Sequence, residues 1–386
     1  MLTIVHRARA AITVVGGSGL LVLAACTQPQ RSPTAREDGI TQNTGGTDDT
    51  SADAMDASAD PGDSDTGSGS GVDSAMDTGD PRDSGADTGE TGPGADTGDI
   101  EETAAVETIK TVFVLVMENH NWHDILGNAD APYINDTLLP MASSTDNYYG
   151  NPLAIHPSLP NYIWMESGDN HDIWSDDDPS ADNVISADHL SAQLEAAGLS
   201  WRSYQEDMPE GICPIYSYGL YAPKHNPFVY FEDVSGSPPS TSATHCIDHM
   251  APYTQLEADL AAGTVASYNF ITPNQCNDMH NASGCATDSQ VKNGDDWLAI
   301  AVPQILASDA WADGGVLFIT WDESEGGEYP IGMIVLSPLA KGGGYVGTTR
   351  YYHSSLLRTV EEIFGLPLLG DAAAQDNLSD LFTTFP

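Results

Sequence analysis

Runs of consecutive apolar residues alternate with amphipathic segments over most of the chain after residue 105. The runs are Thr111–Met117, Val265–Thr272, Val316–Trp321 and the segment IGMIVLSP, with LSWRSYQED as a weaker fifth. Continuous apolar runs of this length predict strands that are buried on both faces. Because helical patterns lie between them, we expect an α/β sandwich.

The segments between the runs have the period and the end signals of helices. SADHLSAQLEAAG starts with a Ser that can cap a helix and closes with Gly, and HSSLLRTVEEIFG also closes with Gly. DDWLAIAVPQILAS is amphipathic, with Pro303 as a predicted kink. NYIWMES reads as a short helix that ends at Gly168. All four fit the start and stop signals of helices.

Acidic, amide and imidazole side chains follow three of the predicted strands. They are Glu118, Asn119, Asp278, His280, Asp322 and Glu323. A single Asp at a strand end is more often a turn residue or a helix cap. Three such ends in one sheet place several carboxylates where α/β proteins bind ligands, which is costly unless a positive charge lies among them. Oxygen and imidazole ligands suit a divalent cation, with Zn, Mn, Mg and Ca left open.

Ser158 lies between two prolines in the stretch HPSLPN, directly before the helix predicted at NYIWMES. Proline fixes φ and pushes the preceding residue out of the helical region, so Ser158 is held in a rigid turn. Ser is a common N-cap, which is one interpretation. The other is that Ser158 is a nucleophile that faces an anion at a helix N-terminus.

The N-terminal region has the features of an export signal followed by a tether. Residues 1–26 combine Arg7 and Arg9 with a short apolar run, which predicts a secretory signal. Its end, LAAC, resembles the lipobox of bacterial lipoproteins, in which Cys26 would be lipidated; an ordinary signal peptide is the alternative. In that resemblance Thr27 favours the outer membrane. Residues 27–105 are rich in Asp, Thr, Ser and Gly and predict a disordered acidic linker.

Charge and cysteine content narrow the class of protein. The chain has 57 acidic and 12 basic residues, which argues against nucleic acid as a partner. Residues 106–386 are enough for one large catalytic domain, whose oligomeric state the sequence leaves open. Its four cysteines predict two disulfides, with three possible pairings. The short spacing favours Cys276–Cys285, together with Cys213–Cys246.

Five motifs, taken together and in order, resemble the phosphoesterase family that contains bacterial acid phosphatases and phospholipases C. They are VMENHNW, HPSLPNY, FITPNQCNDMH, TWDE and YYHSSLLRTVEEIFGLP. That family belongs to the alkaline-phosphatase-like superfamily, and the resemblance covers residues 109–370. It implies a three-layer α/β sandwich with a mostly parallel central sheet. The short chain looks more like the small secreted acid phosphatases.

The resemblance implies a role for each matching position. Ser158 matches the nucleophile. The positions that match metal ligands are Glu118, Asn119, Asp322 and Glu323, with Ser158 completing the shell. The positions implied around the phosphate or a second metal are His156, Asn161, Lys224, His225, Asp278, His280 and His353, with His156, His280 and His353 as further catalytic residues. Asp-Glu stands where classical two-metal members have Asp-His, so we expect one divalent ion.

The predicted function is a metal-dependent phosphomonoesterase that acts on phosphate esters through a phosphoserine at Ser158. The runner-up is a phospholipase C that cleaves phospholipid phosphodiesters. A third hypothesis is an inactive lipoprotein that binds a phosphate ligand, against which the complete Ser, acid and His set argues. We expect an exported protein at the cell envelope that contacts the membrane only through the lipid on Cys26.

Overall fold

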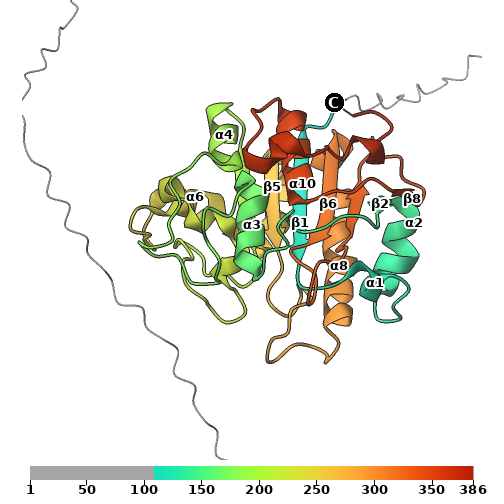
Figure 1. Cartoon of the computed structure of the whole chain (residues 1–386), viewed down its shortest axis with the longest axis horizontal. Coiled ribbons are helices and arrows are strands. Elements are labelled where there is room, and N and C mark those ends of the chain that lie inside the picture. Colours follow the sequence, from blue (N-terminus) through green and yellow to red (C-terminus); the bar gives the residue numbers. More distant parts are fainter. Residues whose placement is uncertain (1–107, 386) are drawn as a thin grey trace, which may run out of the picture. The chain divides into compact units, whose positions relative to one another are not determined.

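The computed structural model describes residues 108–385, and the predicted signal, Cys26 and acidic linker lie outside these described residues. Eight strands form one sheet in the order β4-β3-β5-β1-β6-β7-β2-β8 (Figure 1). Their bounds are β1 Thr111–Met117, β2 Ser143–Thr145, β3 Trp201–Gln205, β4 Met250–Pro252, β5 Tyr268–Thr272, β6 Gly315–Trp321, β7 Met333–Leu336 and β8 Tyr345–Gly347. All but β7 run in one direction, since β7 is antiparallel to both β6 and β2.

Helices flank the sheet. The α-helices are α1 Trp122–Ile125, α2 Leu139–Met141, α3 Ser158–Ser167, α4 Leu190–Ala196, α5 Glu232–Ser235, α6 Thr244–His249, α7 Thr254–Ala262, α8 Gln290–Leu306, α9 Asp309–Ala312 and α10 His353–Phe364. Shorter helical turns are η1 Ile134–Leu138, η2 Pro223–His225, η3 Pro227–Tyr230, η4 Gly370–Ala374 and η5 Ser379–Leu381.

The register of the sheet shows that α3 and α8 cover opposite faces. Val114 of β1 pairs with Phe270 of β5, and Tyr162 of α3 contacts the Phe270 ring edge to face at 6.2 Å. Met117 lies an odd number of residues from Val114 and therefore points to the other face. Gly294 of α8 approaches the Met117 side chain so closely that a Cβ there would lie 2.8 Å from its terminal carbon. The predicted three-layer sandwich with a mostly parallel sheet is therefore confirmed.

The long predicted elements appear where the sequence places them, with differences at their ends. The strand predicted from Val265 begins at Tyr268, and α8 begins at Gln290, where Ser289 accepts a hydrogen bond from the Lys292 N–H. Helix α4 does not start at Ser186, the predicted cap. The Ser186 hydroxyl instead donates to Glu232 at 2.9 Å, and the helix begins at Leu190. Pro303 lies inside α8, which continues to Leu306.

Two disulfides join Cys213 to Cys246 and Cys276 to Cys285, the pairs that the sequence favours. Disulfides of this kind are typical of extracellular or exported proteins. Within residues 108–385, no helix is long and apolar enough to cross a membrane.

Candidate active site

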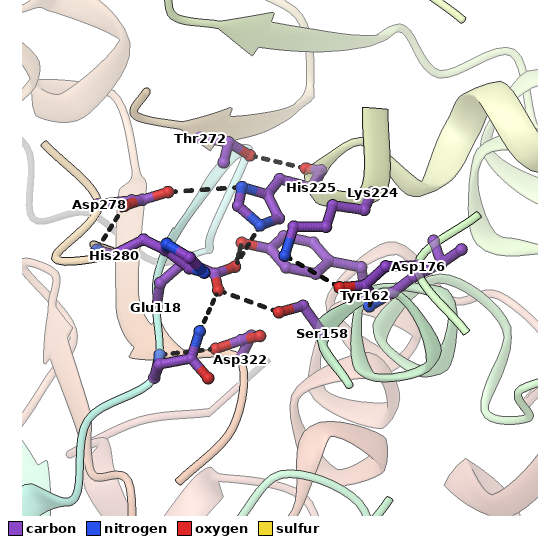
Figure 2. Close-up of polar contacts among 12 residues, drawn as sticks. Glu118, Ser158, Tyr162, Asp176, Lys224, His225, Thr272, Asp278, His280 and Asp322 are labelled. Carbon is purple, nitrogen blue, oxygen red and sulfur yellow. Dashed lines mark hydrogen bonds and ion pairs between the residues drawn. The ribbon is translucent and has the colours of Figure 1, made fainter. Parts of the chain in front are cut away.

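The predicted site residues converge at the carboxyl edge of the sheet. Glu118 directly follows β1, Asp322 directly follows β6, and Asp278 lies in the loop after β5. Helix α3 brings Ser158 to the same place, and η2 brings His225 (Figure 2). Since β5, β1 and β6 are adjacent and parallel, their carboxyl ends lie side by side, which is where ligands bind in such sheets.

Ser158 is the first residue of α3, and Pro157 occupies the N-cap position. Ser158 therefore does not cap the helix, which removes the simpler of the two interpretations of this residue. Its side chain is buried, and its hydroxyl donates to Glu118 Oε2 at 3.1 Å (Figure 2). The next backbone N–H, of Leu159, donates to Asp176 Oδ1 at 3.0 Å. The positive end of the helix dipole thus faces the site.

Glu118 is the centre of the hydrogen-bond network. Its Oε1 accepts from the Tyr162 hydroxyl at 2.6 Å and lies 3.1 Å from His225 Nε2. Its Oε2 accepts from the Asn119 side chain at 2.8 Å as well as from Ser158. The Tyr162 ring stacks on the His225 ring, with centroids 5.3 Å apart. The carboxylate is therefore fixed between an imidazole on one oxygen and the serine hydroxyl on the other.

One group of donors here has the spacing of a metal site. Glu118, His225 and Asp278 each offer one ligand atom, all within 4.8 Å of one another, and all three side chains are buried. Three buried atoms nearby form no hydrogen bond: His225 Nε2, Asp278 Oδ2 and Asp322 Oδ2. Buried polar atoms are rarely left without a partner. Two carboxylates and an imidazole with free acceptor atoms fit a divalent cation.

The electrostatics of the carboxylates lead to the same conclusion. Burial raises the pKa of Glu118 and of Asp278 well above the usual range, and the repulsion among these two and Asp322 adds to it. Burial also raises the pKa of Asp322, to about 6. A set of carboxylates this close resists full ionisation unless a cation is bound among them.

Lys224 brings a positive charge to the rim of this cluster. Its Nζ donates to Asp176 Oδ2 at 2.9 Å, and its side chain is 15% exposed. Burial lowers the pKa of Lys224, but Glu118 and Asp176 outweigh that effect and the pKa is raised. Lys224 is therefore a charged ammonium at the entrance to the site.

Glu323 and His156 lie in a neighbouring network instead of the Glu118 group. Glu323 Oε2 lies 2.8 Å from His156 Nδ1 and accepts from the Asn161 side chain at 3.1 Å. Burial, then the charge of Asp322, raises the pKa of Glu323 to about 9. Glu323, a predicted metal ligand, therefore lies outside the Glu118 group. The residues that offer ligand atoms beside Glu118 are His225 and Asp278.

Asn119 contacts the site through both its backbone and its side chain. Its backbone N–H donates to Asp322 Oδ1 at 3.0 Å, and its amide donates to Glu118. Asn119 has a φ of +46°, a region that Asn tolerates better than most residues. In this conformation Asn119 links the ends of β1 and β6.

The last two predicted histidines occupy different positions. His353 is buried; its Nε2 lies 2.6 Å from the Asp322 carbonyl oxygen and its Nδ1 lies 3.1 Å from the Tyr148 hydroxyl. Burial lowers the pKa of His353 to about 4, so the ring is neutral. His280 lies at the rim, 6.1 Å from the His225 ring, and its backbone N–H donates to Asp278 Oδ1 at 2.7 Å. Burial also lowers the pKa of His280.

Two further residues of the site were given no role in the sequence analysis. Tyr162 follows the SLPN stretch, so its proximity to Glu118 depends on how α3 packs against β1. Asp176 lies in the acidic stretch SDDDPS, where nothing distinguishes it from its neighbours. It holds both Lys224 and the first turn of α3.

Comparisons with known proteins identify relatives of this chain. A phosphatidylinositol-3-phosphatase of Mycobacterium tuberculosis is 28% identical over 282 residues, covering 72% of this chain and 85% of its own. A probable acid phosphatase of Kluyveromyces lactis is 25% identical over 296 residues, and an acid phosphatase of Aspergillus fumigatus is 25% identical over 271 residues. These alignments cover 73% and 67% of this chain but only 64% and 55% of the two fungal proteins.

Among solved structures, one from a study of glycosaminoglycan metabolism by Bacteroides thetaiotaomicron aligns with 72% of this chain and 82% of its own. Its TM-score is 0.50 and the identity is 11%, which shows a shared fold. The model of the phosphoesterase family matches residues 143–367, which is more than half of the chain. The chain therefore belongs to the phosphoesterase family of phosphoric ester hydrolases.

Proposed function

We propose that the protein is a metal-dependent phosphomonoesterase in which Ser158 is the nucleophile. The observation that carries the proposal is the position of the Ser158 hydroxyl, which donates to Glu118 beside three buried atoms without hydrogen-bond partners. A serine hydroxyl is a weak nucleophile until a base or a metal activates it. In this proposal Glu118 is the base, and the group of Glu118, His225 and Asp278 holds the metal.

The proposed ion is divalent and is held by Glu118, His225 and Asp278, with Asp322 adjacent. A divalent ion bound there would lower the pKa of the serine hydroxyl and neutralise charge on the phosphoryl oxygens. One ion is proposed at this site, because one such donor group faces Ser158 in the described part of the chain.

The reaction proposed for Ser158 has two displacement steps. The hydroxyl proton passes to Glu118 Oε2, which already accepts its hydrogen bond, and Oγ attacks phosphorus in line. The ester oxygen leaves as the alcohol, and phosphoserine forms. Water then attacks the same phosphorus from the opposite side and gives one proton to His280, which donated its own to the leaving oxygen. Glu118 returns its proton to Ser158 Oγ as phosphate leaves. Lys224 and the N-terminus of α3 stabilise the negative charge that develops on phosphorus.

The remaining predicted residues have supporting roles in this proposal. His280 at the rim is proposed to supply a proton to the leaving oxygen. His353 is proposed as a positioning residue, because its ring nitrogens contact Tyr148 and the main chain of Asp322. His156 and Asn161 are proposed to hold Glu323 near the phosphate.

Phosphate monoesters are the proposed substrates. The similarity to a phosphatidylinositol-3-phosphatase over 85% of that protein favours a phosphoinositide, and the acid phosphatases favour soluble monoesters. A phospholipase C would instead cleave a phosphodiester and release diacylglycerol. The same assay separates these possibilities from an inactive binding protein.

The test is to measure phosphate release from p-nitrophenyl phosphate and phosphatidylinositol 3-phosphate, beside p-nitrophenylphosphorylcholine as the diester, with and without chelator. We expect both monoesters to be hydrolysed and chelator to remove the activity. Ser158→Ala should lose at least about 1,000-fold in kcat. Ser167→Ala, at the other end of α3, is the control and should keep activity. Full activity in Ser158→Ala with an unchanged circular dichroism spectrum would refute the proposal.

We also propose that Cys26 carries lipid and that the acidic residues 27–105 link this anchor to the catalytic domain. The two disulfides support export, which this proposal requires. Attachment through the lipid alone would leave the catalytic domain free to reach soluble esters and lipid head groups.

A further inference from the structure

A second group of metal-ligating side chains lies outside the candidate active site. It consists of Glu195 at the end of α4 and of His245 and His249 on α6. Their ligand atoms all lie within 4.8 Å of one another. His245 Nε2 is 2.7 Å from Glu195 Oε1, and His249 Nε2 is 3.5 Å from the same oxygen. Two histidines four residues apart lie on one face of a helix, so α6 presents both rings to Glu195.

The hydrogen bonds of the rings fix which nitrogens are available. His245 Nδ1 lies 2.8 Å from the Asp233 carbonyl oxygen, and His249 Nδ1 lies 2.9 Å from the His245 carbonyl oxygen. A carbonyl oxygen only accepts, so both Nδ1 atoms carry the hydrogen. In the neutral rings, both Nε2 lone pairs therefore point toward the Glu195 carboxylate. Three electron-rich atoms this close repel one another unless a metal ion or a proton lies between them.

The surroundings hold the three ligands in place. The Trp201 Nε1–H donates to Glu195 Oε1 at 2.7 Å, and the Trp201 ring stacks on His249 with centroids 4.3 Å apart. The disulfide to Cys213 fixes α6 at Cys246, which lies between the two histidines in the sequence. Partners that orient the ligands in this way are typical of metal sites.

The spacing suits a zinc-like ion. Bonds of about 2.0–2.1 Å in a tetrahedral site separate the ligand atoms by about 3.3 Å. The distances from the two Nε2 atoms to Glu195 Oε1, 2.7 and 3.5 Å, lie on either side of that value. Two imidazoles and one carboxylate are borderline ligands that zinc accepts. The three side chains are 25–38% exposed, so a fourth position is open to water.

This group is separate from the candidate active site. Trp201 is the first residue of β3, and His249 directly precedes β4. Both strands run parallel to β5, so the group lies at the amino edge of the sheet. The Glu118 cluster lies at the carboxyl edge. We propose that Glu195, His245 and His249 form a second metal site, specific for Zn²⁺ or a similar transition metal, which clamps α4 to α6.

The test measures Zn²⁺ binding by the full-length chain, purified without a polyhistidine tag and with both disulfides intact. Bound zinc is determined by competition with a chromogenic chelator. We expect two ions per chain in the wild type. His249→Phe should lose one ion and keep phosphatase activity, because phenylalanine preserves the stack on Trp201 and removes the ligand nitrogen. His225→Gln should lose the other ion together with activity.

Two further variants keep the test decisive if His249→Phe does not fold. Glu195→Gln is nearly isosteric and should weaken zinc binding at the second site at least about 10-fold. Trp201→Phe removes the Nε1–H that orients Glu195, together with part of the ring that stacks on His249, and should also weaken zinc binding about 10-fold. Zinc should raise the unfolding temperature of His225→Gln but not of His225→Gln/His249→Phe. Equal zinc affinity in the wild type and Glu195→Gln would overturn the proposal. The contact between His245 and Glu195 would then be a hydrogen bond from a protonated His245 ring.

Discussion

Lys224 brings a positive charge to the buried carboxylates of the candidate active site. Burial and neighbouring carboxylates raise the pKa of Glu118 and Asp278, and the charge of Lys224 offsets part of that increase. Asp176 holds its ammonium at the rim, where it faces the cluster (Figure 2). In the proposed reaction this ammonium binds the phosphoryl group and also balances the carboxylates.

Lys224→Met should lower kcat/KM for p-nitrophenyl phosphate about 100-fold, the size of effect seen when one preorganised donor is removed. Lys224→Arg should recover part of the loss, because the charge is kept but its geometry changes. Lys292→Met is the control, since Lys292 forms an exposed pair with Asp296 on α8. Unchanged kcat/KM in Lys224→Met would place this residue outside the reaction.

At the residue scale, the sequence indicated the positions that directly follow a strand. Glu118 and Asp322 could be predicted because β1 and β6 end at their neighbours and are adjacent in the sheet. The pairing of His225 with Glu118 could not, because it depends on η2 folding over α3. Long-range packing of this kind leaves no local pattern. The same is true of Tyr162.

At the element scale, α3 connects the candidate nucleophile to the core. Its C-terminal end closes at Gly168, which has a φ of +69°. A Cβ at Gly168 would lie 2.8 Å from the Leu369 carbonyl oxygen and 2.9 Å from the Asp371 nitrogen. Gly263 closes α7 with nearly the same φ, +66°, but a Cβ there would meet nothing within 4 Å. Substitutions at Gly168 and Gly263 therefore distinguish the cost of backbone strain from the cost of steric contact.

Gly263→Ala should lower the free energy of unfolding by about 1 kcal/mol, from the left-handed conformation alone. Gly168→Ala should lower it by roughly 2–4 kcal/mol, because the backbone of 369–371 must also move. Chemical denaturation of both variants measures the difference. Equal losses in the two variants would contradict this prediction, because they would show that residues 369–371 move to accommodate the new methyl group at no cost in free energy.

Three helices meet at His189, which precedes α4. Its Nδ1 lies 3.0 Å from Glu166 of α3, and its Nε2 lies 3.1 Å from Asp233 of α5. Burial lowers the pKa of His189, but the hydrogen bonds to Asp233 and Glu166 outweigh it and raise the pKa to about 9. The protonated ring thus stabilises the packing of α3, α4 and α5.

The pKa of His189 is higher in the folded chain than its unfolded value of about 6.5. Its contribution is therefore complete below about pH 6.5 and is lost as the pH rises through about 9. The contribution is on the order of 3 kcal/mol. Urea unfolding of wild type and His189→Asn should differ most at about pH 6 and least at about pH 10. His123→Asn, at an exposed ring, is the control, and a pH-independent difference would contradict the prediction.

The long strands of the central sheet were predicted well, whereas α7 and the shortest strands were not. β1 matches its prediction from end to end, and β6 differs by one residue. β2, β4 and β8 have three residues each, too few for a pattern of buried positions. The antiparallel direction of β7 was also not predicted, because an apolar run looks the same in either direction.

At the scale of the whole molecule, the formal net charge of −45 bears on how the protein reaches its substrate. Anionic membrane surfaces repel such a chain. If a phosphoinositide is the substrate, electrostatic attraction cannot hold the enzyme to the lipid surface. Attachment through lipid on Cys26 would supply the proximity that charge opposes.

Cys26→Ser should therefore move the phosphatase activity from the membrane fraction to the soluble fraction, with kcat for p-nitrophenyl phosphate unchanged. One acyl chain binds a membrane only marginally, but lipoproteins of the type that the LAAC stretch resembles carry more than one, which gives stable attachment. The measurement is activity in membrane and soluble pools after a high-salt wash, with Cys26→Ser and wild type compared in the same cells. Salt removes proteins held by charge and leaves those held by lipid. If Cys26→Ser still sediments with membranes after the wash, the attachment lies in an apolar surface of the catalytic domain and the lipobox interpretation is wrong.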